Sequence, residues 1–165
     1  MPFKFSNGIK IFIFSRSSSK RLKRKFEQKI GKESILDVLI LRLKKHFKTS
    51  TIKLCVPKKD FQEYMRFKKR HGLEILTGPE EDLIKRTLIN AKNLKAIIRL
   101  TADDPLVSQE LIKNFITIYN KKKYDYIYST DICDGMVPEL ISIRYLKRIY
   151  SQLNDKNSSN YSNVF

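Results

Sequence analysis

Two polar segments carry the side chains that could do chemistry, and each follows a short hydrophobic run. The first, residues 15–25, reads SRSSSKRLKRK and contains six cations, which are Arg16, Lys20, Arg21, Lys23, Arg24 and Lys25. Six cations at this spacing repel one another unless an anion joins them. Serine hydroxyls, backbone N–H groups and cationic side chains at the end of a strand can cradle the oxygens of a triphosphate. A solvated basic loop or a nucleic-acid contact would have the same composition, and the spacing is not that of a Walker A motif.

The second segment, residues 99–107, reads RLTADDPLV and places two carboxylates and a proline directly after a hydrophobic run. Carboxylates in this position can hold a hard cation, and Mg²⁺ usually takes one or two carboxylates together with substrate phosphates. A Mg²⁺ ion at Asp103 could therefore face a triphosphate held by the first segment. The other interpretation of Asp-Asp-Pro is ordinary turn chemistry and helix capping.

The pattern around these segments predicts alternating strands and helices. Short β-rich runs predict strands over 9–14, 52–56, 73–76, 96–100 and 124–129. Apolar spacings of three and four residues predict helices over 34–47, 57–72 and 78–93 and after 108, with Ser34 and Ser108 as N-caps, Pro57 and Pro79 at two helix starts and Gly72 as a stop. This rhythm predicts an α/β fold with a Rossmann-like, mostly parallel sheet flanked by helices. The loops after the first and fourth strands would share the edge where ligands bind.

The composition is that of one folded domain with a strong excess of basic residues. With 165 residues the chain has room for one domain, predicted over 1–150, and residues 151–165 are predicted to be either a polar tail or the start of a missing C-terminal part. Hydrophobic residues make up 41%, which is enough for a core, and the formal net charge is +17. The first fifty residues hold 14 basic and 3 acidic side chains, so anions are predicted to bind mostly there.

The same sequence favours a soluble cytoplasmic protein with no membrane partner. Cys55 and Cys133 stand 78 positions apart without partnering Cys or His residues, so neither a zinc site nor a disulfide framework is indicated. The first apolar run is shorter than the core of a signal peptide. The longest later apolar stretch is interrupted by Asp37 and Arg42, which argues against a membrane span.

The segment IFIFSRSSSKRLKRK, residues 11–25, resembles the opening of the nucleotidyltransferases that activate acidic or amino sugars with CTP. Their strand-loop signature reads roughly A-R-x-G-S-x-R-L-P-G-K, and they include spore-coat polysaccharide and acylneuraminate cytidylyltransferases. Four further stretches are similar to the spore-coat branch, in the family's order: IGKESILDVLILRLKK, ILTGPEEDLIKR, AIIRLTADDPLVSQELI and DGMVPELIS. The resemblance covers about residues 9–150 and implies a nucleotide-diphospho-sugar transferase-like fold.

Matching positions imply roles for individual residues. Phosphate-binding positions are matched by the catalytic candidates Arg16, Arg21 and Lys25 and by Ser18 and Ser19. Asp103 matches the carboxylate that binds Mg²⁺, whereas Asp104 matches a position that is often small and stays outside the metal site. The block near the nucleotide is matched by Glu81, Asp82 and Arg86, and the block near the acceptor sugar by Asp134, Gly135 and Glu139. Taken alone, the acidic residues of these two blocks are equally compatible with ordinary exposed polar side chains.

Three departures from the family pattern bear on activity. Ser18 stands where the signature has Gly, Lys23-Arg24 replaces Pro-Gly, and Val137 replaces a common acidic residue. If the glycine positions require positive φ or a close approach of backbone to phosphate, Ser18 and Arg24 would strain the cradle. Family members also usually continue well beyond the point where this chain stops, with further sheet and homodimer contacts there.

The resemblance implies transfer of a cytidylyl group from CTP to a sugar or sugar-like acceptor, with release of pyrophosphate, in surface polysaccharide biosynthesis. The expected partners are CTP, a sugar acceptor and a second copy in a homodimer, and the expected cofactor is Mg²⁺. The altered cradle leaves open an inactive relative that still binds nucleotide. The basic charge leaves open a nucleic-acid-binding domain, although the chain lacks a stacking-aromatic motif and a basic recognition helix.

Overall fold

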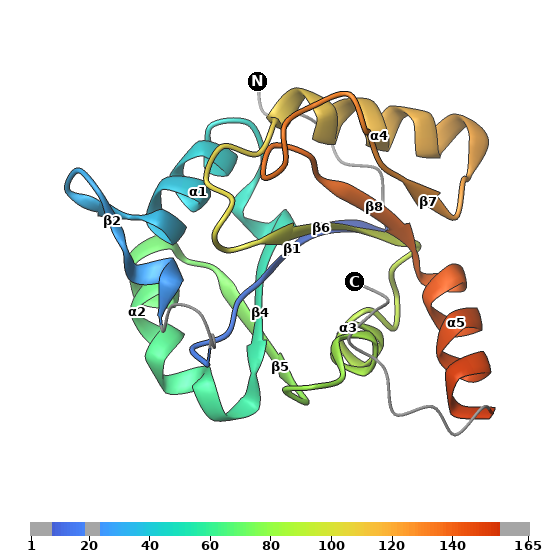
Figure 1. The fold of residues 1–165 in the computed structure, drawn as a ribbon, viewed down its shortest axis with the longest axis horizontal. Coiled ribbons are helices and arrows are strands. Elements are labelled where there is room, and N and C mark those ends of the chain that lie inside the picture. Colours follow the sequence, from blue (N-terminus) through green and yellow to red (C-terminus); the bar gives the residue numbers. More distant parts are fainter. Residues whose placement is uncertain (1–7, 19–23, 156–165) are drawn as a thin grey trace.

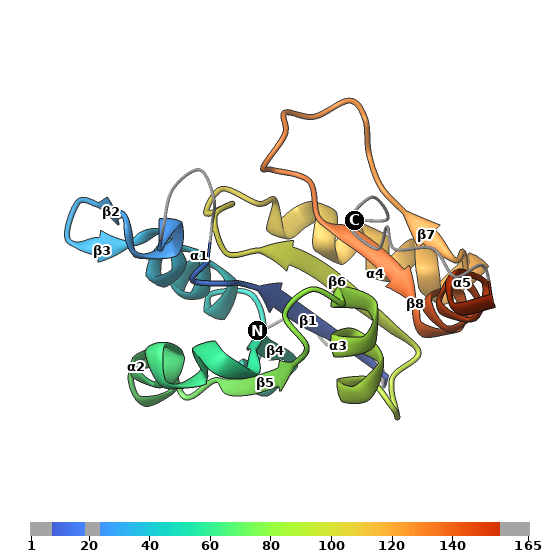
Figure 2. The same ribbon diagram turned by 60° about the horizontal axis from the view of Figure 1, so that its bottom comes forward.

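Residues 8–18 and 24–155 are described by the structure, a computed structural model, and they are built around a six-stranded sheet (Figure 1). The strands, in their spatial order across the sheet, are β5 (Glu74–Gly78), β4 (Ile52–Pro57), β1 (Ile9–Phe14), β6 (Ala96–Thr101), β8 (Glu139–Ser142) and β7 (Tyr126–Ile127). The helices are α1 (Ile35–Lys44), α2 (Phe61–His71), α3 (Leu83–Asn90), α4 (Gln109–Lys122) and α5 (Ile143–Asp155). A separate hairpin of β2 (Lys29–Ile30) and β3 (Glu33–Ser34) projects away from the sheet beside α1 (Figure 2).

The four strands β5, β4, β1 and β6 are parallel, as the sequence predicts. β1 pairs with β4 on one side and with β6 on the other, so that Ile11 stands opposite both Ile52 and Ile98. A strand with neighbours on both sides and helices on both faces requires a continuous apolar run, and the sequence IKIFIF of β1 meets this requirement. Every residue of β1 except Lys10 is buried.

The predicted strand over 124–129 is shorter in the structure and antiparallel. Its strand part is β7, which runs antiparallel to β8, while β8 runs antiparallel to β6. Tyr124, Tyr126 and Tyr128 are exposed, whereas Ile127 between them is buried. This alternation belongs to an edge strand with one face in water, because a central parallel strand would need apolar residues on both faces.

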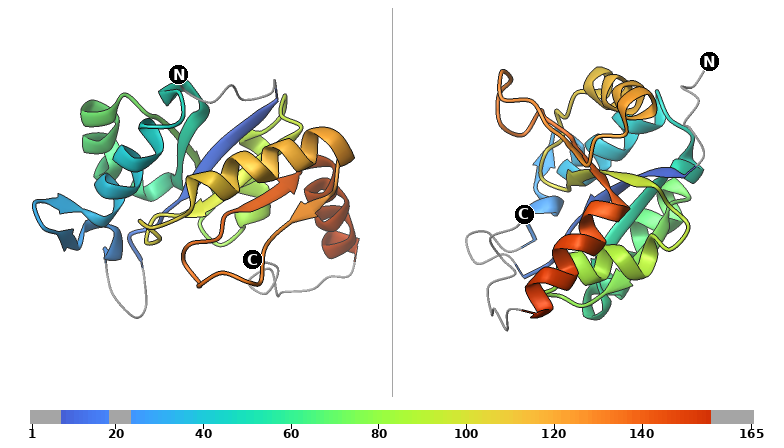
Figure 3. Two further views of the ribbon diagram at one scale, coloured as in Figure 1. Left: turned by 90° about the horizontal axis from the view of Figure 1, so that it is seen from above. Right: turned by 90° about the vertical axis from the view of Figure 1, so that its right-hand side faces the viewer.

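Helices cover both faces of the sheet through two hydrophobic clusters (Figure 3). Successive side chains of a strand point to opposite faces, so Ile11 and Ile13 belong to one cluster and Phe12 and Phe14 to the other. The first cluster includes side chains of α1, α2 and α4, and the second includes side chains of α3 and α5. Both faces are therefore occupied, and polar loops gather at the ends of the strands.

One buried carboxylate, Asp37, holds the start of α1 and the end of α2. Ser34 and Asp37 form a capping box, in which Asp37 N donates to Ser34 Oγ at 3.1 Å. The other side of the Asp37 carboxylate lies 2.7 Å from Nε2 of His71, and Gly72 follows with a φ of 72°. The predicted N-cap at Ser34 and stop at Gly72 are confirmed, as is the predicted cap of α4 at Ser108.

Two predicted helix starts are wrong. Pro57 is the last residue of β4, and a 3-10 turn over Lys58–Asp60 precedes α2. Pro79 does not open α3, because the Asp82 side chain accepts a backbone hydrogen bond at 2.7 Å and caps a helix that begins at Leu83. A helix begins where a cap satisfies its first free N–H groups, and here the cap comes three residues after the proline. The residues between them form a loop at the carboxyl end of β5.

The C-terminal helix of the described residues extends beyond the predicted domain. α5 continues to Asp155, past the predicted domain boundary at residue 150, and packs against the second cluster. The remainder of the predicted polar tail, 156–165, lies outside the described residues. Within residues 8–18 and 24–155, no helix is long and apolar enough to cross a membrane.

We expect Asp37→Asn to lower the free energy of unfolding, and to do so most at neutral pH. Burial would raise the pKa of Asp37, but hydrogen bonds from His71 and Ser34 outweigh burial and leave the pKa below its ordinary value. A carboxyl group of this kind contributes stability above its unfolded pKa, and the contribution is lost as the pH falls through its folded pKa. Denaturant titrations of both proteins should differ by about 1–3 kcal/mol at neutral pH, and the difference should shrink below about pH 4. A difference that is constant with pH would contradict this assignment.

Candidate functional site

The loops after β1 and β6 leave the same edge of the sheet from neighbouring strands. From β1 the chain goes on to β4 and β5 on one side, whereas β6 lies on the other side of β1. At such a reversal of strand order the two loops diverge, and ligands of open α/β sheets bind there. Ala102 N still donates to Phe14 O at 2.9 Å, and Ser15 N donates to Cys55 O at 3.1 Å. The two segments that the sequence singled out therefore begin side by side.

One ion pair joins the two segments. Lys25 Nζ lies 2.6 Å from Asp103 Oδ2, and the two side chains are 49% and 34% exposed. Lys25 is the first residue of a 3-10 turn, Lys25–Glu27, that ends the first loop. Burial would raise the pKa of Asp103, but hydrogen bonds from Lys25 and Thr101 outweigh burial and leave the pKa below its ordinary value. Asp103 is therefore a charged carboxylate that already faces a cation.

Asp104, the next residue, has the opposite electrostatic character. Burial raises the pKa of Asp104, and the neighbouring charge of Asp103 adds to this although Thr101 Oγ1 donates a hydrogen bond to it. A Cβ atom added to Gly135, whose φ is 79°, would lie 3.2 Å from Asp104 Oδ1. The loop before β8 thus passes directly against Asp104.

A buried carboxylate that sequence reasoning missed holds the first loop. Asp60 is 3% exposed and accepts hydrogen bonds from Ser17 N and Ser17 Oγ, both at 2.8 Å. Ser15 Oγ and Tyr64 OH lie 2.7 Å apart and add a second link to α2. Arg16, between these two anchored serines, is exposed. No local pattern connects Asp60 with Ser17, because the contact spans 43 positions of the chain.

Arg24 stands in a left-handed backbone conformation, with φ 54° and ψ 37°. Arg24 and Lys123 are the non-glycine residues with positive φ in the part of the chain that the structure describes. An L-residue pays on the order of 1 kcal/mol there, so the strain expected at the second missing glycine is present. Nε of Arg24 lies 2.9 Å from Glu27 Oε2. The predicted residues Ser19 and Arg21 lie outside the described residues.

Glu80, also missed from the sequence, links loops that follow three different strands. Ser18 Oγ donates to Glu80 Oε1, and Lys59 Nζ lies 2.5 Å from Glu80 Oε2. The hydrogen bond from Lys59, followed by that from Ser18, lowers the pKa of Glu80. Glu81 beside it is exposed. Ser18 is therefore held by a carboxylate on the side of β5, at the same edge as the Lys25 pair.

The other predicted residues after β5 make contacts inside the protein. Arg86 is 2% exposed, and its Nη2 donates to Glu80 O at 3.0 Å, whereas its Nε has no hydrogen-bond partner among the described residues. Burial lowers the pKa of Arg86. A Cβ atom at Gly78 would lie 2.8 Å from Arg86 Cγ, so α3 packs tightly against β5. Asp82 caps α3 and accepts a hydrogen bond from Tyr150 OH at 3.0 Å. A nucleotide-binding role for either residue stays a prediction.

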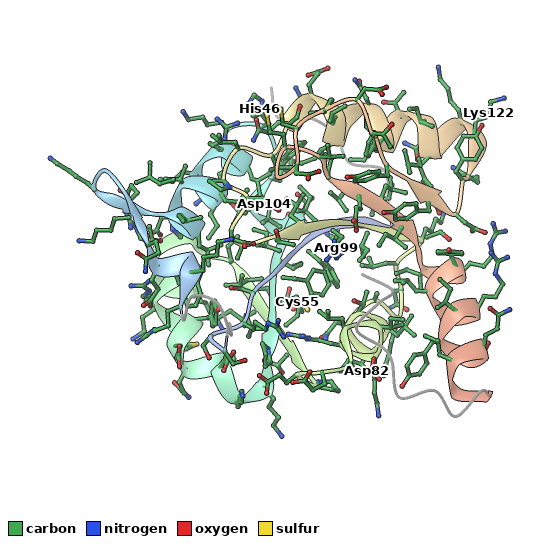
Figure 4. The ribbon with its side chains drawn as sticks, in the orientation of Figure 1. His46, Cys55, Asp82, Arg99, Asp104 and Lys122 are labelled. Atoms are coloured by element: carbon green, nitrogen blue, oxygen red, sulfur yellow. The ribbon has the colours of Figure 1, made fainter. Side chains whose placement is uncertain are left out.

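A pocket of about 150 Å³ opens beside Asp104, between β6 and the loop before β8. Its polar lining comes from Arg99, Thr101, Asp104, Tyr128 and Glu139. Arg99 Nη1 lies 2.8 Å from Glu139 Oε2, and Figure 4 places Arg99 and Asp104 on β6 and the loop that follows it. Two of the predicted acceptor residues, Gly135 and Glu139, line this pocket, whereas Asp134 is exposed beside Gly135.

Comparison with known proteins finds one family and several relatives. A family model described as cytidylyltransferase matches residues 11–163. An uncharacterised protein of Methanocaldococcus jannaschii is 31% identical over 148 residues, which are 87% of this chain and 60% of that protein. The spore coat polysaccharide biosynthesis protein SpsF of Bacillus subtilis is 28% identical over 148 residues, which are 85% of this chain and 61% of SpsF. The chain thus spans about 60% of the length of these relatives.

Solved structures share the fold. A cytidylyltransferase from Leptospira borgpetersenii matches with a TM-score of 0.79 and 25% identity, covering 87% of this chain and 64% of that one. A CMP:2-keto-3-deoxy-manno-octonic acid synthetase complexed with CTP matches with a TM-score of 0.66 and covers 89% of this chain and 78% of that one. At 12% identity the second match bears on the fold alone. The family match over most of the sequence and the shared sheet agree, and this chain belongs to the cytidylyltransferase family.

Proposed function

We propose that this chain transfers a cytidylyl group from CTP to a sugar or sugar-like acceptor and releases pyrophosphate, as a step of surface polysaccharide biosynthesis. The observation that carries the proposal is the contact between Lys25 and Asp103, 2.6 Å apart where the loops after β1 and β6 diverge. Transfer from a triphosphate needs fixed charges on both sides of the reacting phosphate, and this contact brings a cation and a carboxylate together. Membership of the cytidylyltransferase family and likeness to a spore coat polysaccharide biosynthesis protein support it.

Asp103 fits a Mg²⁺ ion that binds together with phosphate. Its lowered pKa keeps the carboxylate charged at neutral pH, and its ion pair with the Lys25 ammonium supports a role in binding a cation. Across the described ranges, no three His, Cys, Asp or Glu side chains gather where they could hold a metal ion. Mg²⁺ suits such a site, because it usually takes one or two carboxylates and completes its shell with water and substrate phosphates. When bound at Asp103, Mg²⁺ would neutralise charge on the phosphate that is attacked.

The first loop would bind the triphosphate with its cationic side chains, and its described start, residues 15–17, is anchored from inside the protein. Arg16 lies between two serines that Tyr64 and Asp60 hold in place. Arg16 and Lys25 would stabilise the charge on the departing pyrophosphate, with Arg21 assigned to the same task from the sequence. Because the anchors of the loop are buried, little reorganisation is needed when this charge develops.

The pocket beside Asp104 would hold the acceptor. Asp103 contacts Lys25, while its neighbour Asp104 lines the pocket. A phosphate bound at Asp103 would therefore lie near both the cations of the first loop and the pocket for the acceptor, which brings the reacting groups together. The paired side chains of Arg99 and Glu139 supply both donors and acceptors for the hydroxyl groups of a sugar.

We expect Asp103→Asn to leave folding intact and to slow transfer on the order of a thousandfold. Asn serves the turn before Pro105 nearly as well as Asp, so the melting temperature should stay the same, but the amide does not replace the charge that holds Mg²⁺. The measurement is pyrophosphate release from CTP with Mg²⁺ over a panel of acidic and amino sugars.

Glu110→Gln is the matched control, because Glu110 is an exposed acid on α4 that pairs with Lys113. Its rate should equal that of the unmodified chain. Equal rates in the Asp103 variant would remove Asp103 from the metal site, and no release by the unmodified chain on any acceptor would contradict transfer itself.

A second candidate function is nucleotide binding without transfer, and the backbone of Arg24 favours it. Arg24 has a φ of 54° at a position where the family signature has glycine. The guanidinium side chain stands where a glycine would let phosphate approach the backbone closely. CTP affinity by calorimetry without any pyrophosphate release would distinguish this function from transfer.

We expect Arg24→Gly to be more stable than Arg24→Ala by about 1 kcal/mol. Both variants lose the ion pair with Glu27, so the difference in their stability reports only the backbone conformation at residue 24. A left-handed conformation favours Gly over Ala. At an exposed position with negative φ, the Ala variant would be the more stable of the two. Denaturant titration of the two variants measures the difference, and greater stability of the Ala variant would rule out strain at this residue.

A further inference from the structure

Lys25 stands where a metal ion on Asp103 would need to bind. Its Nζ atom lies 2.6 Å from Oδ2 of Asp103, and the two residues are 78 positions apart in the chain. We propose that Lys25 is the resident cation of Asp103 in the nucleotide-free chain and excludes a free divalent metal until a triphosphate draws its ammonium away. This inference rests on the proposed function, because it takes Asp103 as the metal ligand. It adds an order of binding, in which the metal enters with or after the nucleotide.

The carboxylate of Asp103 offers one negative charge to two competing cations. Lys25 occupies Oδ2, so a metal ion must share this carboxylate with the ammonium or displace it. A metal about 2.1 Å from a carboxylate oxygen would stand next to the Lys25 ammonium, and the two cations would repel each other. Asp104 does not supply a replacement, since it accepts a hydrogen bond from Thr101 Oγ1 and lies against Gly135.

Lys25 can leave Asp103 without any change in the fold. Its side chain is 49% exposed, and its ammonium is carried on a flexible four-carbon stem. The backbone of the turn is fixed independently, because Gln28 N donates to Lys25 O at 3.1 Å and Glu27 N donates to Arg24 O at 2.9 Å. A triphosphate carries several negative charges and therefore attracts the ammonium more strongly than a single carboxylate does. Rotation of one side chain would then expose Asp103 to the metal.

Two neighbouring cations of this edge, Lys59 and Arg24, pair with other carboxylates. Lys59 pairs with Glu80 at 2.5 Å, and Arg24 pairs with Glu27 at 2.9 Å. Lys59 and Glu80 form the same kind of exposed lysine–carboxylate pair on the same edge of the sheet. Lys59→Met therefore removes the same charge as Lys25→Met and serves as its matched control.

The test is a titration of the nucleotide-free chain with Mn²⁺, with free Mn²⁺ followed by electron paramagnetic resonance. Lys25→Met should bind Mn²⁺ about tenfold more tightly than the unmodified chain, because a competing cation is gone. Lys59→Met should bind Mn²⁺ as the unmodified chain does. Adding Asp103→Asn to Lys25→Met should abolish the gain, which locates it at this carboxylate.

Each outcome of the titration decides the inference separately from the proposed function. Equal Mn²⁺ affinity in Lys25→Met and the unmodified chain would overturn the inference, even if pyrophosphate release shows that the chain is active. An equal gain in Lys59→Met would also overturn it, since the effect would then be one of general charge. An Asp103-dependent gain in Lys25→Met, together with no pyrophosphate release by the unmodified chain, would support the inference and contradict transfer.

Discussion

The burial of β1 on all sides is the constraint on which the rest of the structure depends. Strands flank it on both edges and hydrophobic clusters cover both its faces, so its position can change only if the whole sheet changes. The strand ends at Phe14, where apolar residues give way to SRSSSK, and from that point water and anions can reach the chain. The end of the apolar run of β1 therefore sets where the polar residues of the candidate site begin.

The loop after β1 is held from inside the protein and charged outside. Buried polar groups must be paired, and Asp60 meets this requirement by accepting two hydrogen bonds from Ser17. Outside, ion pairs line the same region, among them those of Lys25 with Asp103, Lys59 with Glu80 and Arg24 with Glu27. The chain has a net charge of +17, so cations close together at this edge repel one another. The paired carboxylates offset this repulsion and so help to keep the loops together.

The sequence predicted correctly those features that depend on residues close together in the chain, such as helix caps and stops. Ser34, Gly72 and Ser108 are caps or stops because of their own side chains and backbone freedom, and all three could be recognised from the sequence. The meeting of residues 15–25 with residues 99–107 could also be predicted, because strand order in parallel sheets follows general rules.

Contacts between distant residues could not be predicted in this way. Asp60 and Ser17 are 43 positions apart, and Arg99 and Glu139 are 40 apart, with no repeated pattern to connect them. The start of α3 was missed for a different reason, since the sequence favoured Pro79 as the first helical residue, whereas the side chain of Asp82 caps the helix. The close packing of α3 against β5 also limits which residues can replace Gly78 in evolution. Even the Cα atom of Arg86 would lie 3.1 Å from a Cβ at position 78, so lineages of this chain can replace Gly78 only if α3 as a whole moves away from the sheet.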